Sequence, residues 1–243
     1  MFSSILILVI SCVFVRSQQI QSVVRQNRPL TSPIFDEITI DGAFDVFLIQ
    51  PNEIANSVVE VETIPSVQQQ IIVEVLENHI LSIRTIGNIR VPQNINVHIQ
   101  LKTPLRRYTF RGTGNTVTHM TGLLNPTNDK LVIEQLGTGN LAMKFNVNFL
   151  DYYQTGSGTA QFFGQVRSQL SIINNGVGEV NTLEVITPFV KVLSSGMSVS
   201  RIAATNDVDI EVTGVGNVFY QLPSGRVPSK EITTGIGRIV RLT

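Results

Sequence analysis

The sequence predicts an all-β protein whose short strands stack in parallel as the coils of a single-stranded β-helix, a solenoid with about 20 residues per coil. Four observations lead to this fold class. Gly-x-Gly recurs at a nearly fixed spacing through the second half of the chain, and short β-branched segments of alternating polarity fill the first half. Only 15% of the residues are charged, and no long stretch shows a convincing helical period.

Residues 1–17 have the features of a signal peptide. Ile5 to Val15 form an apolar run of suitable length, and Ser17 is a small residue suited to the position before cleavage. The run is too short to span a bilayer comfortably, and the alternatives are an uncleaved anchor or a buried strand. We therefore expect a secreted, extracellular protein with no membrane span in its mature chain.

The composition excludes several functions. Cys12 is the sole cysteine and lies in the leader, so the mature chain would have no disulfide, thiol nucleophile or thiolate metal site. With 18 basic and 18 acidic residues the formal net charge is zero, which gives no cationic footprint for nucleic acid. Tryptophan is absent, so a stacking platform for sugars would have to come from tyrosine and phenylalanine.

The mature chain is expected to begin with a flexible lead-in. Residues 18–33 are polar and rich in glutamine, and periodic sequence starts near Phe35. Residues 34–243 then form a single domain. Residues 35–101 consist of period-2 segments bounded by Pro, Asn and Gly, and Val67 to Val75 is the one segment in which helix and strand compete.

From about residue 105 the chain repeats itself. Each unit reads as an apolar strand, a small polar residue, Gly-x-Gly and another strand, and a coil of about 20 residues has room for three short strands and three corners. Corners favour glycine because they need positive φ and because stacked corners bring backbones close together. The expected corner glycines, including one in a degenerate copy (Gly196), are Gly112, Gly114, Gly137, Gly139, Gly156, Gly158, Gly176, Gly178, Gly196, Gly214, Gly216, Gly235 and Gly237.

Alignment of the coils on the first glycine predicts an inward column and a charged outer column. Four residues before the glycine the side chains are large and mostly apolar from Tyr108 to Ile210, which indicates the interior. Glu231 breaks this column and suggests a one-residue slip that puts Ile232 in its place. Five residues before the glycine, opposite charges fall on adjacent strands, which indicates a solvated face. These charges are Lys191, Asp209 and Lys230.

Two further columns lie at the corners. The residues two before the glycine either point inward as a hydrogen-bonded amide ladder or face solvent; they are Gln135, Gln154, Asn174 and Ser194. The middle residue of the corner is polar in the early coils and apolar in the later ones. The apolar tips Val177, Met197, Val215 and Ile236 are a candidate stripe for a partner, and packing inward or under a loop is the alternative.

Two features of the sequence resemble a known family. One is the opening segment Phe35 to Val46, and the other is the serial Gly-x-Gly corner, best kept at Thr155 to Gly158 and at Thr213 to Val218. Together they resemble the putative autotransporter-adhesin head domain, the GIN domain, best known from bacteria. The resemblance covers residues 34–243.

The resemblance implies a right-handed β-helix similar to pectin-lyase-like folds, without agreed catalytic residues. The sequence departs from the pattern at Met197 and Ser198. It also departs in the irregular coil that contains Leu123 to Lys130, where we expect an inserted loop.

Catalytic or metal-binding clusters are weakly indicated. Asp207, Asp209 and Glu211 alternate on one strand face and could act as acid and base or contribute to a calcium site, but two lysines are their expected neighbours. His79, His98 and His119 have no zinc-ligand spacing. The densest basic patch would bind an acidic glycan or simply be solvated; it comprises Arg106, Arg107 and Arg111.

The sequence therefore favours a secreted, non-catalytic protein that presents a surface for adhesion or for binding an extracellular glycan, matrix protein or surface protein. No cofactor and no nucleic-acid partner are expected. One alternative is a polysaccharide-processing enzyme of the β-helix type. Another is a self-assembling structural protein, a homo-oligomer, because no obvious capping helix follows Gly237 and an uncovered coil is a pairing edge.

Overall fold

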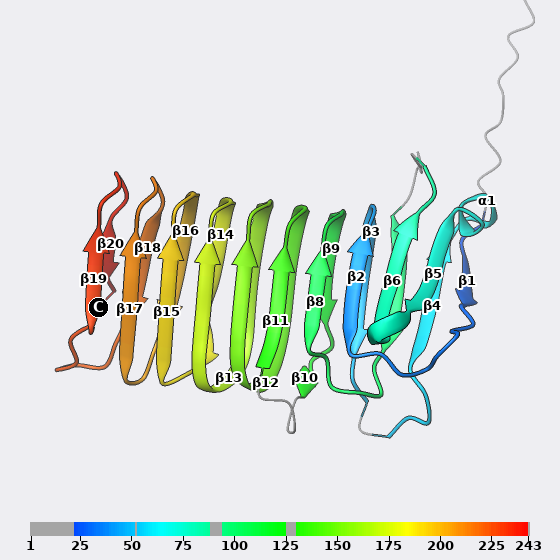
Figure 1. Cartoon of the computed structure of the whole chain (residues 1–243), viewed down its shortest axis with the longest axis horizontal. Coiled ribbons are helices and arrows are strands. Elements are labelled where there is room, and N and C mark those ends of the chain that lie inside the picture. Colours follow the sequence, from blue (N-terminus) through cyan, green and yellow to red (C-terminus); the bar gives the residue numbers. More distant parts are fainter. Residues whose placement is uncertain (1–21, 52, 88–93, 125–129, 243) are drawn as a thin grey trace, which may run out of the picture.

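The computed structural model describes residues 22–51, 53–87, 94–124 and 130–242, and the signal peptide expected at residues 1–17 lies outside them. The described residues form one curled sheet of 20 strands (Figure 1). Its helical content is the short helix α1 (Pro65–Gln68) and the 3-10 turn Glu77–His79. The all-β prediction is confirmed. Among these residues, no helix has the length and apolarity needed to cross a membrane.

The strands lie in two rows, which we call the front wall and the rear wall (Figure 1). In spatial order the front wall contains β5 (Ile71–Leu76), β6 (Ile80–Thr85), β2 (Glu37–Asp41), β8 (Arg107–Phe110), β11 (Lys130–Gln135), the second halves of β12 (Thr138–Gln154) and β13 (Ser157–Asn174), β15 (Phe189–Ser194), β17 (Asp207–Val212) and β19 (Lys230–Thr233). The rear wall contains β1 (Val24–Asn27), β4 (Val58–Thr63), β7 (Ile95–Gln100), β3 (Phe44–Ile49), β9 (Thr113–Thr118), the first halves of β12 and β13, β14 (Val177–Ile186), β16 (Met197–Ala203), β18 (Asn217–Gln221) and β20 (Ile239–Arg241). Strand β10 (Leu123–Leu124) pairs with β12, and residues 125–129 of the expected inserted loop lie outside the described residues.

From β8 onward the pairing is parallel and the alignment predicted from the glycines is observed. Ile133 pairs with Tyr108 on one side and with Tyr152 on the other, and the same column continues to Ile210. The predicted slip at the last layer is wrong, because Ile210 pairs with Glu231 itself. In the same layer Arg241 pairs with the buried Tyr220. Two positions that are buried in the preceding layer are thus charged in the last one.

The layers are simpler than the three short strands and three corners that we expected. Between successive glycine corners the chain runs either as one strand, 17 residues long in β12 and 18 in β13, or as two shorter strands. Register shifts at Val147/Phe149 and at Gln161/Phe163 let the long strands bend without leaving the ladder. The glycine corner is therefore the turn that recurs from layer to layer, whereas the opposite turn is a bend within the strand in β12 and β13 and a connection between two strands in the later layers.

The N-terminal end departs from the parallel pattern. Strand β4 pairs antiparallel with β7, and β5 pairs antiparallel with β6, so both cover the first parallel layer. The flexible lead-in expected at residues 18–33 is wrong for β1, which pairs antiparallel with β4. Arg25 holds it there through an ion pair with Glu60 (2.5 Å), and the amide of Arg28 donates to the carbonyl of Val59 (2.8 Å).

The two glycines of each corner serve different needs. A Cβ on Gly156 would lie 1.9 Å from the carbonyl oxygen of Gly137, so the first position requires glycine for close approach of stacked corners. At the second position, close approach is combined with positive φ in Gly114, Gly139, Gly158 and Gly178. In Gly158, φ is +134° and a Cβ would lie 1.8 Å from the oxygen of Gly139.

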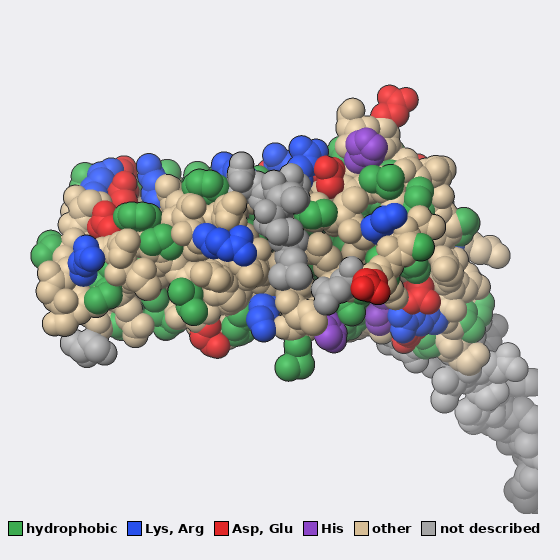
Figure 2. Space-filling view, turned by 90° about the horizontal axis from the view of Figure 1, so that it is seen from below, with side chains coloured by type: hydrophobic (Ala, Val, Ile, Leu, Met, Phe, Trp, Pro, Cys, Tyr) green, Lys and Arg blue, Asp and Glu red, His purple; other side chains and the backbone are tan. Residues whose placement is uncertain are grey.

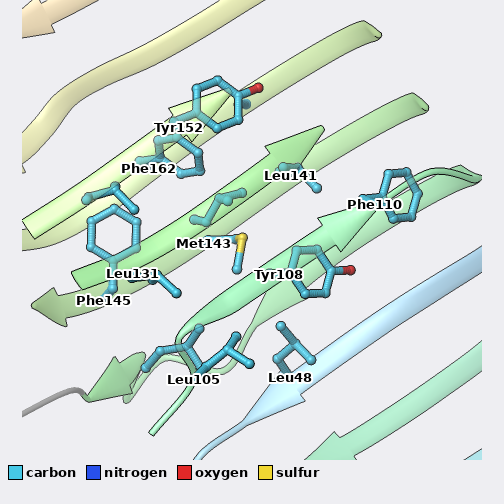
Figure 3. Packing of buried hydrophobic residues seen from close by; sticks show 14 of the residues in the cluster. Leu48, Leu105, Tyr108, Phe110, Leu131, Leu141, Met143, Phe145, Tyr152 and Phe162 are labelled. Atoms are coloured by element: carbon cyan, nitrogen blue, oxygen red, sulfur yellow. The ribbon is translucent and has the colours of Figure 1, made fainter. Parts of the chain in front are cut away.

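The core fills the space between the walls. Buried aliphatic and aromatic side chains alternate with outward residues along most of the strands, and large rings stack from layer to layer (Figure 3). Tyr152 meets Phe162 edge-on at 4.9 Å, and Phe162 meets Phe145 at 5.6 Å. The packed interior makes the walls a rigid support for outward side chains.

Candidate functional site

The predicted stripe of corner tips is stacked and exposed. Val177 pairs with Met197, and the exposed fractions are 46% for Val177, 63% for Met197, 52% for Val215 and 82% for Ile236. The alternative of inward packing is therefore wrong. The binding of a partner by this stripe stays a prediction.

The predicted amide column lies inside, but its hydrogen bonds differ from the expected ladder. Gln135, Gln154, Asn174 and Ser194 are all fully buried. The side-chain amide of Gln135 donates to the carbonyl of Gly139 (2.7 Å), and that of Gln154 donates to the carbonyl of Gly158 (3.0 Å). Each glutamine thus ties down its own corner rather than bonding to its copy in the next layer.

A copy-to-copy ladder does exist, on the outside of the rear wall. Asn94 and Asn115 both donate to the carboxylate of Asp45, at 2.5 and 3.0 Å. Asn140 donates to Asn115 (3.0 Å), and the hydroxyl of Thr159 donates to Asn140 (2.6 Å). Sequence reasoning missed this polar ladder, although its last three members each stand three residues after a first corner glycine.

Next to the polar ladder, the rear wall displays an apolar row. His98, Phe47, Val117 and Ala142 are in register across β7, β3, β9 and β12. The Phe47 and His98 rings stack with their centroids 4.9 Å apart and their planes 14° apart. Phe47 and Val117 are each 40% exposed, so the row offers an apolar surface to solvent.

Two adjoining hollows border this row, and together we call them the rear-wall groove. The first has a volume of about 510 Å³ and is lined by Phe47, His98, Val117 and, at its edges, Arg25 and Met120. The second, of about 450 Å³, shares Val117 and Met120 and reaches Phe163 and Lys144. Figure 2 shows histidine and hydrophobic side chains beside charged ones at one border of the molecule.

Two polar side chains of the first hollow lie beside acidic ones. Arg25 binds Glu60, and His98 Nε2 lies 3.5 Å from a Glu62 oxygen. Burial, assisted by the positive charge of Arg25, lowers the pKa of His98 below its usual value. The imidazole is therefore neutral at physiological pH, and the groove combines an aromatic surface with hydrogen-bonding groups and little net charge.

The acidic triplet has the neighbours predicted for a solvated face. Asp209 pairs with Lys191 and Lys230 in the adjacent strands, and Lys230 Nζ lies 2.7 Å from Glu211 and 4.0 Å from Asp209. The hydrogen bond and charge of Lys230 lower the pKa of Glu211. Within the described part of the chain no three His, Cys, Asp or Glu residues gather to hold a metal ion.

The basic patch is largely paired with acidic side chains, and two of the three histidines lie together. Arg106 binds Asp36 at 2.6 Å, and Arg107 binds Glu134 at 2.6 Å, so two of the three arginines of the patch have acidic partners. His98 and His119 both line the groove, which sequence spacing did not indicate, whereas the third histidine accompanies the 3-10 turn.

A family model and several solved structures are similar to this chain. A family model described as "Putative auto-transporter adhesin, head GIN domain" matches residues 34–221. A putative adhesin from Bacteroides fragilis NCTC 9343 has a similar structure, with a TM-score of 0.80 and 20% identity over 91% of this chain and 97% of that one. A putative adhesin from Parabacteroides distasonis ATCC 8503 (TM-score 0.60, 17% identity, 91% and 98% covered) and a putative lipid binding protein from the same organism (0.59, 14%, 91% and 97%) are also similar. No curated protein matches the sequence. None of the three structures is described as pectin-lyase-like, so that part of the resemblance is not supported.

Proposed function

We propose, because the chain belongs to the putative auto-transporter adhesin head GIN domain family, that it is a secreted adhesive protein that binds an extracellular glycan in the rear-wall groove. The observation that supports this most directly is the exposed Phe47 ring, held flat against His98 and bordered by the polar ladder. The family and two of the three similar structures are described as putative adhesins, and a surface or extracellular location is in keeping with that description.

The chemistry of the groove suits a sugar ring. A pyranose has an apolar face that packs on an aromatic ring and a rim of hydroxyls that exchange hydrogen bonds. Here Phe47 and Val117 offer the apolar surface, while Gln100, His119 and the Asn115 amide of the ladder offer donors and acceptors at its sides. A neutral sugar needs no charged partner, in keeping with the uncharged donors and acceptors beside the apolar surface.

The wall makes the site rigid before any ligand arrives. Phe47 lies on β3, which pairs with β7 on one side and β9 on the other. Little conformational entropy is then lost on binding, which raises the affinity of a shallow groove. We also propose that the chain winds as a right-handed parallel β-helix of about 20 residues per coil, an arrangement that the parallel pairing of successive layers supports.

A glycan and matrix-protein array probed with the secreted chain tests the proposal. We expect saturable binding to a glycan, and Phe47→Ala should weaken it about tenfold, the loss of roughly 1.4 kcal/mol that removal of one stacked ring brings. Phe149→Ala is the matched control, because that ring is 38% exposed on the front wall, outside the groove.

Two outcomes would contradict the proposal. A blank array would argue against glycan and matrix binding altogether. A glycan that binds the wild type and the Phe47→Ala variant equally would place the binding surface elsewhere, with the exposed stripe of corner tips as the next surface to change. Turnover of the bound glycan, lost on Asp209→Ala, would favour the alternative of a polysaccharide-processing enzyme.

A further inference from the structure

The inward face of the corners forms a polar column through the middle of the core. The hydroxyls of Tyr108 and Tyr152 point toward the corner end of their strands (Figure 3). Tyr108 bonds to Thr116 (2.6 Å), and Tyr152 donates to Gln135 (2.5 Å). As far along the column as Gln135, these polar side chains find partners within the protein.

The side chains of the column become shorter from the early layers to the later ones. The amides of Gln135 and Gln154 reach the carbonyl of the second glycine of their corners. Asn174 takes the same place in the next layer and pairs in register with Gln154, but it is one methylene shorter. Ser194, in register with Asn174, has no amide at all. The corresponding carbonyl of Gly178 therefore receives no direct bond from Asn174.

The facing side of the interior does not compensate for this loss. The inward residues of the rear wall opposite the column are Leu141, Ala160, Val180, Ser200 and Val218, which are in register with one another. The layer with the shortest front residue, Ser194, thus faces Ser200, and Ser198 adds a third hydroxyl. Both neighbouring layers have valine where this layer has Ser200.

The polar atoms of this region have no partner among the described residues. Both amide atoms of Asn174, the amide oxygen of Gln154 and the hydroxyls of Ser194, Ser198 and Ser200 are buried without a hydrogen bond. All five side chains are fully buried. Burial of such groups without partners is costly, and in native proteins ordered water satisfies them.

We propose that the interior between Gln154 and Ser200 binds a short file of water molecules. Water suits the site because each molecule needs two to four polar partners of either kind, and amides and hydroxyls both donate and accept. No carboxylate faces this interior in the described residues, which disfavours a cation. Val212 and Val218 close the file toward the last layer. One water takes the place of the missing methylene and links Asn174 to the Gly178 carbonyl.

Asn174→Gln is the sharpest test, because it restores the side chain that the two preceding layers use. We expect the longer amide to reach the Gly178 carbonyl and displace one water. Oxygen-17 magnetic relaxation dispersion, which counts water molecules held inside a protein, should report one fewer than in the wild type. Asn175→Gln is the matched control, since this neighbouring side chain is exposed.

A second variant tests the proposal without depending on how the longer amide of Asn174→Gln fits into the core. Ser200→Val reproduces the residue of both adjoining layers and should also lower the count of internal waters. The inference is overturned if neither variant differs from Asn175→Gln, or if a high-resolution crystal structure shows the column dry or occupied by a metal ion. Density peaks within hydrogen-bonding distance of Asn174 and the three serines would support it.

Discussion

Replacement of Gly156 by alanine tests how tightly the corners stack. The new Cβ would lie 1.9 Å from the Gly137 carbonyl oxygen, whereas real Cβ contacts essentially never fall below 3.0 Å. The two corners would have to separate by at least 1.1 Å, the difference between these distances. Three hydrogen bonds of 3.1 Å join them, from Thr155 N and Gly156 N to Gln135 O and from Ser157 N to Gly137 O, and those of Gly156 and Ser157 would be broken. At roughly 1–2 kcal/mol for each lost bond with its stranded groups, the free energy of unfolding should fall by about 2–4 kcal/mol.

Urea denaturation followed by far-ultraviolet circular dichroism measures this change, because the chain has no tryptophan. Gly225→Ala is the control. Its φ is +79°, but no atom lies within 4 Å of the added Cβ, so it should lose only the conformational cost of about 1 kcal/mol. If Gly156→Ala is no more destabilised than Gly225→Ala, close approach is not what requires glycine at the first corner position.

Three further changes address the end of the stack, the groove and the polar ladder. The mass of the double variant Glu231→Ile/Arg241→Leu, measured by light scattering, should rise with protein concentration, because the uncovered last layer would then be apolar. Arg238→Leu removes an exposed charge from the same layer and is the control, with a mass expected to equal that of the wild type. The pKa of His98 is lowered in the folded protein, so the contribution of His98 to stability is complete above pH 6.5 and is lost as the pH falls toward the pKa of the folded state. In that window the free energy of unfolding of His98→Gln should depend less on pH than that of the wild type. Asn140→Leu removes two links of the ladder and should lower the free energy of unfolding by about 1 kcal/mol, and a value near zero would mean that solvent replaces those bonds equally well.

The parallel part of the fold was predictable because glycine marks its corners. An added Cβ at the first corner position meets a backbone oxygen of the layer below, so other residues are excluded and the spacing survives as a readable signal. The register of Tyr108, Ile133 and Tyr152 followed directly from that spacing. The N-terminal end was not predictable in this way. Alternation of polarity in Val58–Thr63 is the same for either strand direction, so it could not indicate antiparallel pairing.

The groove escaped sequence analysis for a related reason. Phe47, His98 and Val117 meet only because β3 lies between β7 and β9, an order that chain sequence does not give. The column alignment began at the first repeated corner, Gly112, and so did not include β3 and β7. The structure extends the stack backward, since a Cβ on Gly112 would meet the oxygen of Gly42 at 1.7 Å.

The last layer bears on whether the protein displays a surface or assembles with itself. Strands β19 and β20 each pair on one side within the described residues, which would favour stacking of a second copy if the inward positions were apolar. They are instead Glu231 and Arg241. The guanidinium of Arg241 donates to the carbonyls of Leu222, Pro223 and Arg226, and burial with a hydrogen bond to Glu231 raises the pKa of Tyr220 to about 12. A second stack placed here would have to bury both charges, so we expect inward charge at this end to oppose the stacking of a second copy.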